Sequence, residues 1–102
     1  GCAVPEALRH RWHLHLRGDV RNLRRIVRRT GPIDLFHYDS DKSYVGRARA
    51  LAIVEPHLRP GAAVVFDDIQ DNAFFLDLAH RRGGPAFVFD HGAKYVGMFP
   101  AW

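Results

Sequence analysis

Apolar residues along this chain fall into short runs and into longer stretches with helical spacing. Two short runs, residues 33–38 and 62–66, stop abruptly at acidic residues, which is typical of buried parallel strands whose carboxyl ends open into a site. Between them a helix is predicted, ended by Pro60-Gly61. Its apolar positions are Tyr44, Ala48, Leu51, Ala52 and Leu58. The pattern predicts a right-handed strand-helix-strand unit, in which ligands bind outside the carboxyl ends of the strands.

The remaining segments extend this unit on both sides. In chain order, the predicted elements are a strand (12–16), a helix (20–29), a strand (33–38), a helix (44–58), a strand (62–66), a helix (71–82) and two strands (85–89 and 95–99). Asp71 is expected to cap the last helix, and Gly83-Gly84 to end it. The two final strands are close enough in sequence for an antiparallel hairpin. This order indicates an α/β fold with three layers.

Composition narrows the class of protein. The 102 residues are 47% apolar, which is enough for one domain with a core. No apolar run approaches the roughly 20 residues that cross a bilayer, and the first residues do not resemble a signal peptide. Cys2 is the only cysteine, so it has no partner for an internal disulfide. We therefore expect a cytoplasmic protein without a membrane partner.

The net charge of +4 is unevenly distributed, because residues 1–30 hold eight arginines against Glu6 and Asp19. A basic segment of this kind favours an anionic partner. However, Val20, Leu23, Ile26 and Val27 form an apolar stripe on the predicted helix, so its arginines are expected to occupy a solvated face. No aromatic residues are interleaved with them, which disfavours nucleic acid as a partner.

The acidic strand ends carry a pattern that resembles a known family. Its three parts are Asp34-Leu-Phe-His-Tyr-Asp-Ser-Asp-Lys-Ser-Tyr44, Leu58-Arg-Pro-Gly-Ala62 and Val64-Val-Phe-Asp-Asp-Ile69. The pattern resembles the second half of class I S-adenosylmethionine-dependent methyltransferases, and most closely the group called methyltransferase family 24. Lys42 stands where that group often has His, and Ala62 replaces a Gly. The lysine makes this strand end similar to catechol and caffeoyl-coenzyme A O-methyltransferases.

The resemblance implies roles for several residues. Asp39 and Asp67 would be metal ligands, Asp68 would stand in place of an Asn ligand, and Lys42 would be the general base. The implied contacts with the S-adenosylmethionine cofactor are Asp19, Val20, Asp39 and Ser40. The resemblance also implies a small-molecule methyl acceptor, with O-methyl transfer to a small molecule or a sugar.

The chemistry of methyl transfer agrees with these roles. An in-line displacement needs the acceptor oxygen to be aligned with the methyl carbon and stripped of its proton. Hard oxygen ligands suit Mg²⁺, which lowers the pKa of a bound acceptor. Lys42 could take the proton if burial lowers its pKa. His37 falls on the same face of its strand as Asp39, by the period of two, and is a second candidate for catalysis.

The resemblance covers most of residues 12–99 but only part of the family's domain. We expect residues 1–102 to be a C-terminal piece with a Rossmann-like sheet truncated to strands 3 to 7, because strands 1 and 2 and the glycine-rich cofactor loop have no counterpart in the sequence. The missing N-terminal half would then be a partner, and this piece alone would be inactive. The strand over residues 12–16, lacking its neighbours, is expected to be detached or re-paired.

Two other functions remain open. Asp39-Ser40-Asp41 matches the Asp-x-Asp of nucleotide-sugar glycosyltransferases, in which two carboxylates hold a metal against a diphosphate. The basic segment of residues 9–29 would instead suit a non-enzymatic nucleic-acid-binding module. His13 and His15 share one face of the predicted strand, but no third residue is spaced to complete a zinc site with them.

Overall fold

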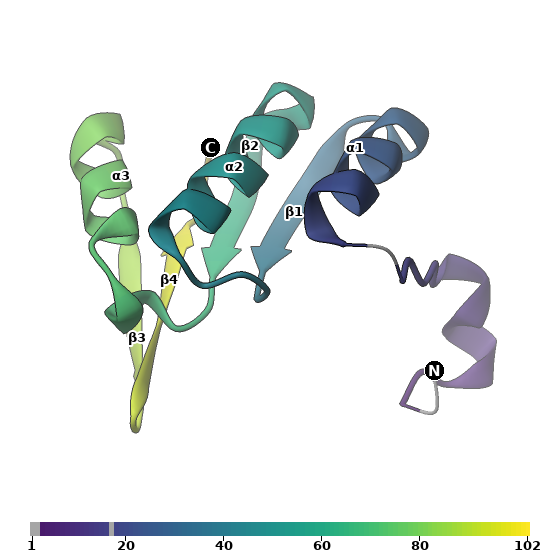
Figure 1. Ribbon diagram of the computed structural model, residues 1–102, viewed down its shortest axis with the longest axis horizontal. Helices are drawn as coiled ribbons and strands as arrows, with labels where there is room; N and C mark the ends of the chain where they lie inside the picture. Colours follow the sequence, from purple (N-terminus) through teal and green to yellow (C-terminus); the bar gives the residue numbers. More distant parts are fainter. Residues whose placement is uncertain (1–2, 17) are drawn as a thin grey trace.

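A computed structural model describes residues 3–16 and 18–102 and shows an α/β fold (Figure 1). The helices and strands alternate along most of the chain, as expected. The 3₁₀ helices are η1 (Glu6–Arg11), η2 (Glu55–His57) and η3 (Ile69–Asp71), the α-helices are α1 (Asp19–Thr30), α2 (Tyr44–Val54) and α3 (Phe74–Arg82), and the strands are β1 (Ile33–Tyr38), β2 (Leu58–Phe66), β3 (Phe87–His91) and β4 (Lys94–Phe99). None of the helices in the described residues is long and apolar enough to span a membrane.

The four strands form one mixed sheet in the order β1-β2-β4-β3. β1 and β2 are parallel, with Tyr38 opposite Phe66. β4 is antiparallel to both β2 and β3. The hairpin between β3 and β4 closes more tightly than predicted, because Gly92 adopts a positive φ of 77° and His91 pairs with Lys94. The carboxyl ends of β1 and β2 therefore share one edge with the start of β4.

Local signals explain most of the helix boundaries. α2 begins after Ser43, whose hydroxyl accepts a hydrogen bond from the Gly46 amide at 2.9 Å. α3 ends at Gly83, which has the left-handed conformation. The predicted cap Asp71 was wrong, because Asp71 lies within η3 and the Asn72 side chain accepts from the Phe74 amide instead, at 3.1 Å.

The predicted helix over residues 44–58 was too long. α2 gives way to η2 after Val54, and Leu58 already belongs to β2. Pro56 explains the early end, because its ring removes a backbone donor and is tolerated only in the first turn of a helix.

The strand predicted over residues 12–16 is not formed. The segment runs extended alongside α1, where the Asn22 amide group donates to the His15 carbonyl at 3.3 Å. Among the described strands, β1 pairs only with β2, so its other edge carries no partner. Leu14 and Leu16 remain 60% and 86% exposed. The expectation that this segment would be detached from the sheet is therefore confirmed.

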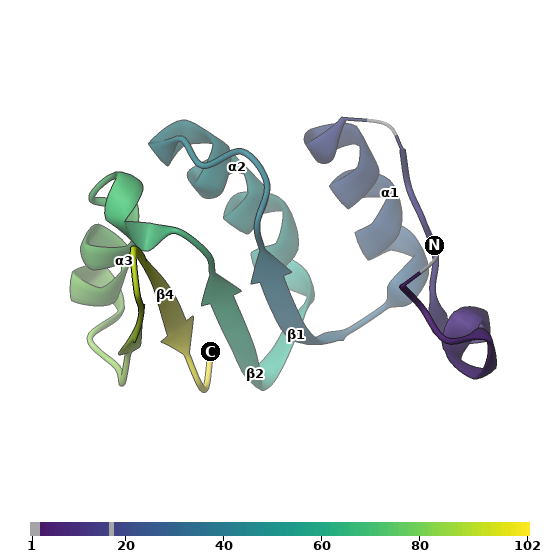
Figure 2. The same cartoon turned by 90° about the horizontal axis from the view of Figure 1, so that it is seen from below.

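The fold has two layers, a sheet and a layer of helices, rather than the predicted three, because α1, α2 and α3 all lie on one face of the sheet (Figure 2). The core lies between these helices and the inward side chains of the strands, and includes Phe36, Val64, Phe66, Phe74 and Phe99. Val27 of α1 is buried while the arginines beside it are exposed, which confirms the solvated basic face. Within the described residues there is no further α-helix to cover the other face.

On that uncovered face, alternate side chains of each strand point away from the helices. Leu35 of β1 and Phe89 of β3 are 60% and 51% exposed, and Val65 and Val96 lie between them, partly buried. This set of apolar residues is the bare face of the sheet. A contiguous apolar surface of this kind is a site of association.

Gly97 of β4 provides a test of the packing between sheet and helices. A Cβ at this position would overlap the ring of Phe75, which is 2% exposed and stacks on Phe99 with ring centroids 4.8 Å apart. Because that ring has no room to move, we expect Gly97→Ala to lower the free energy of unfolding by roughly 1–3 kcal/mol. Gly84→Ala, which meets no atom within 4 Å, is the matched control in urea denaturation. Equal stabilities for the two variants would contradict this packing.

The bare face predicts self-association. With an unpaired β1 edge beside exposed apolar side chains, we expect the chain to form oligomers at micromolar concentration. Leu35→Lys should weaken association roughly tenfold or more, because it removes an apolar side chain from the contact between two copies of the chain. Leu76→Lys changes a leucine of similar exposure, 57%, on α3 and should have little effect. Sedimentation velocity of the three proteins tests this, and a wild-type monomer at all concentrations would refute it.

Candidate functional site

The parallel pairing of β1 and β2 brings three carboxylates together at the carboxyl edge of the sheet. Asp39 follows β1, and Asp67 and Asp68 follow β2. The Asp67 amide donates to the Tyr38 carbonyl at 3.1 Å, which holds the two strand ends side by side. One oxygen of each carboxylate lies within 4.8 Å of the others. The expectation that Asp39 and Asp67 share this edge is therefore confirmed.

Two lysines neutralise most of this charge. Lys42 Nζ lies 2.8 Å from Asp39 Oδ1 and 4.0 Å from Asp67 Oδ2, and it also bonds to Asp68. Lys94 Nζ donates to Asp67 Oδ2 at 3.0 Å. Asp67 is buried, with 8% of its surface exposed, whereas Asp39 is exposed. We call these three carboxylates and two lysines the acidic cluster.

Sequence reasoning missed Lys94. The signal was indirect: Lys94 opens β4, and β4 runs antiparallel to β2, so the start of β4 must lie at the carboxyl end of β2. Placing it there requires the order of the strands as well as their boundaries. The lysine therefore becomes visible only once the sheet is assembled.

The ion pairs shift the pKa values of their members. Hydrogen bonds from Lys42 hold the pKa of the Asp39 and Asp68 carboxyls below their usual value. The same bonds raise the pKa of Lys42, and the bond to Asp39 has the largest effect. The bond to Asp67 likewise raises the pKa of Lys94. The condition under which Lys42 could take a proton, a pKa lowered by burial, is thus not met, because the lysine is partly exposed and held by carboxylates.

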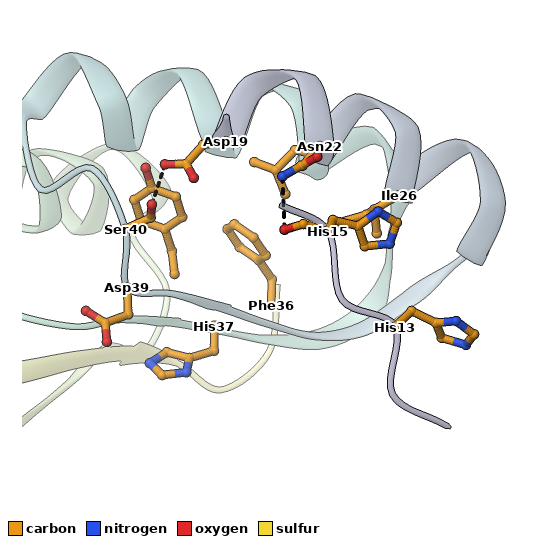
Figure 3. Close-up of a pocket in the computed structure, with 11 residues that line it drawn as sticks. His13, His15, Asp19, Asn22, Ile26, Phe36, His37, Asp39 and Ser40 are labelled. Atoms are coloured by element: carbon orange, nitrogen blue, oxygen red, sulfur yellow. Dashed lines mark hydrogen bonds between the residues drawn. The ribbon is translucent and has the colours of Figure 1, made fainter. Parts of the chain in front are cut away.

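A pocket of about 380 Å³ lies between α1, the end of β1 and the extended segment before α1 (Figure 3). Asp19, Asp39 and Ser40 line it, and the Ser40 hydroxyl donates to the Asp19 carboxylate. Phe36 and Tyr38 also line it. Three of the four residues predicted to contact a cofactor therefore meet in one pocket. Val20 lies outside it, in an open hollow at the start of α1.

His37 points away from the helices and lies beside Asp39 (Figure 3). It also lines a groove of about 600 Å³ on the bare face, together with Asp39, Asp67 and Lys94. The acidic cluster thus stands at the end of this groove. The structure places His37 next to the cluster, although its side chain makes no hydrogen bond to the described residues.

Other residues considered as metal ligands, His13, His15 and Asp41, do not join the acidic cluster. His13 and His15 both line the pocket, His15 beside Ile26 (Figure 3). Asp41 accepts a hydrogen bond from the Ser43 amide at 3.0 Å and so belongs to the start of α2, not to the cluster. Within residues 3–16 and 18–102, Asp39, Asp67 and Asp68 form the only group of three potential metal ligands.

Comparison with known proteins gave one match. A family model described as a methyltransferase domain matches residues 3–69, which is about two thirds of the chain and includes all three carboxylates. No curated protein matches the chain. No solved structure matches it either.

The acidic cluster predicts a pH-dependent contribution to stability. Asp39 and Asp68 stabilise the fold above their ordinary pKa of 3.8 and lose this contribution as pH falls through their lowered values. Lys42 contributes below its ordinary 10.5 and loses its contribution as pH rises through its raised value. Lys42→Met should therefore lower the melting temperature most between about pH 5 and 9, and least near pH 2.

Thermal melts of both proteins in the presence of a chelator measure this difference. Lys94→Met leaves Asp39 and Asp68 paired with Lys42, so it should keep the loss of stability that the wild type shows as pH falls from about 5 to 2. A difference between wild type and Lys42→Met that is constant from pH 2 to pH 9 would show that the ion pairs do not form.

Proposed function

Because the chain belongs to the methyltransferase-domain family, we propose that it carries part of a methyl-transfer site. This part would bind the adenosyl end of S-adenosylmethionine next to the methyl acceptor. The acceptor is a hydroxyl of a small molecule, which makes the reaction an O-methyl transfer. The observation that carries this proposal is the acidic cluster, since three carboxylates and a lysine meet where the two parallel strands end. Ligands bind at this edge in open α/β sheets.

The pocket between α1 and β1 supports the cofactor's place. It combines apolar side chains, Leu23, Ile26 and Phe36, with the carboxylate of Asp19. An adenine ring offers a flat apolar surface and an amino group that donates to a carboxylate, so it matches both features. Ser40 bonds to Asp19 and fixes its orientation. We propose that Asp19 and Ser40 bind the adenosyl group there, and that Val20 contacts the cofactor from the neighbouring hollow at the start of α1.

The donor set of the acidic cluster fits a divalent cation such as Mg²⁺, which prefers carboxylate oxygens. Asp39, Asp67 and Asp68 would hold it. When bound, the cation supplies a Lewis acid that lowers the pKa of the acceptor hydroxyl. Three carboxylates against two ammonium groups leave a net negative charge, which also favours a cation.

The chain's own residues supply the proton acceptor. In the transfer, the acceptor oxygen forms a bond to the methyl carbon while the bond from that carbon to the cofactor's sulfur breaks, and the hydroxyl proton leaves to a base. Lys42 keeps its proton while Asp39 and Asp68 hold it, so it can act as the base only after those bonds are released and its own proton has passed to solvent. His37, exposed in the same groove, is the second candidate.

We further propose that the described sheet is the C-terminal part of the family's domain. β1 and β2 would be its fourth and fifth strands, and β4 and β3 its last two. The order β1-β2-β4-β3 supports this correspondence, since the antiparallel strand lies next to β2 and not at the edge. The extended segment before α1 would take the place of the third strand.

The substitution Asp39→Ala tests the site when it is made in the naturally occurring protein that contains this sequence. With a cation ligand gone, metal-stimulated methyl transfer from labelled S-adenosylmethionine to a panel of small-molecule hydroxyl compounds should fall on the order of 10²–10³-fold. Cofactor affinity, measured by calorimetry, should fall far less than the rate, because Asp19 and Ser40 remain in the pocket. Asp34→Ala removes an exposed carboxylate from the opposite end of β1 and serves as control.

A fully active Asp39→Ala enzyme would remove the metal from the proposal and leave Lys42 or His37 as a metal-free base. Asp19→Ala should show the converse pattern, with weaker cofactor binding. If neither variant differs from wild type, the site lies elsewhere.

A further inference from the structure

Arg47 is a charged side chain buried beneath the acidic cluster. It lies on α2 with 1% of its surface exposed, as deeply buried as Phe74 and Phe99. Within the described residues it pairs with no carboxylate. Burying a guanidinium without an anionic partner is costly, so its position requires an explanation.

The contacts of Arg47 are with two consecutive backbone carbonyls. Its Nη2 donates to the carbonyl oxygens of Asp67 and Asp68, at 3.0 and 2.8 Å. These carbonyls belong to the turn that leads from β2 into η3. Charged donors make stronger hydrogen bonds than neutral ones, so the pair of bonds fixes this turn firmly.

The same turn is conformationally strained. Asp68 has φ of 49°, and it is the only non-glycine residue of the described chain in the left-handed region. Such residues persist only where their surroundings hold them, and they gather at functional sites. The Asn72 amide group adds a second restraint by donating to the Lys42 carbonyl at 2.8 Å. Hydrogen bonds from the side chains of Arg47 and Asn72 therefore both restrain the strained turn.

Simple packing does not explain Arg47. An apolar side chain of similar volume would fill the same space without burying a charge. Moreover, the Nη1 nitrogen is buried and reaches no hydrogen-bond partner in the described part of the chain. A residue retained only to fill the core would not leave a donor unsatisfied.

We propose that Arg47 is a positioning residue for the acidic cluster. By holding the carbonyls of Asp67 and Asp68, it keeps the strained turn in place and so aims both carboxylates at Asp39. It does not touch the cation or the substrate. The inference rests on the proposed role of these carboxylates in binding a divalent cation, and it adds a buried residue of α2 to the site.

The test uses the whole 102-residue chain with Mn²⁺ as the probe. Binding is followed by the electron paramagnetic resonance signal of free Mn²⁺, and amide hydrogen exchange is measured without metal. Arg47→Met removes the charge and both bonds, Arg47→Lys keeps a charged donor, and Arg49→Met removes the same charge from the exposed face of the same helix. Urea denaturation reports the stability of each protein.

We expect Arg47→Met to bind Mn²⁺ at least tenfold more weakly and the amides of residues 67–71 to exchange at least tenfold faster, while the central residues of β2 keep their protection. Arg47→Lys should recover part of both losses, and Arg49→Met should match wild type. The inference is overturned if Arg47→Met matches Arg49→Met in both measurements, or if its exchange rises equally throughout the sheet. If the wild type takes up no Mn²⁺, the metal proposal fails, and local exchange alone decides the role of Arg47.

Discussion

The parallel pairing of β1 and β2 is the constraint on which the site depends. Its register places Tyr38 opposite Phe66, so the next residue of each strand is an aspartate at the same edge. Phe36, Tyr38 and Phe66 bury their rings against one another on the helix side, with centroids 6.0 to 6.4 Å apart. A slip of one residue would turn those rings to solvent and the aspartates toward the core. The aromatic core therefore fixes where the carboxylates lie.

The charges at this edge are balanced by side chains from different parts of the chain. Lys42 comes from the loop after β1 and Lys94 from the start of β4, so the acidic cluster ties the crossover unit to the hairpin. A divalent cation and Lys42 would compete for the oxygens of Asp39 and Asp68. Charge balance would therefore link cation binding to the release of Lys42, whose ammonium group would have to lose a proton to solvent before its amine could take the proton of the acceptor.

Much of the sheet could be predicted because its strands end in strong local signals, whereas contacts between distant segments could not. The apolar stripe predicted for α2 was only partly right. Leu51 is buried and Ala48 is half-buried, but Tyr44 and Ala52 are exposed. The buried face also carries Arg47, Ala50 and Val54. A pattern that counts arginine as polar cannot find a helix whose inner face contains one. Residues 12–16 alternate like a strand, but alternation does not supply the neighbouring strand that a ladder of hydrogen bonds needs.

The alternation of side chains along β1 explains how one strand end can serve both halves of the proposed reaction. Phe36 and Tyr38 face the helices and line the pocket in which the adenosyl group is proposed to bind, whereas His37 and Asp39 line both that pocket and the groove of the bare side. Ser40, one residue further, bonds back to Asp19 on the pocket side. An in-line displacement requires donor and acceptor on opposite sides of the transferred carbon. A strand that ends between a pocket and a groove provides that separation within a few residues, and the acidic cluster lies where the two meet.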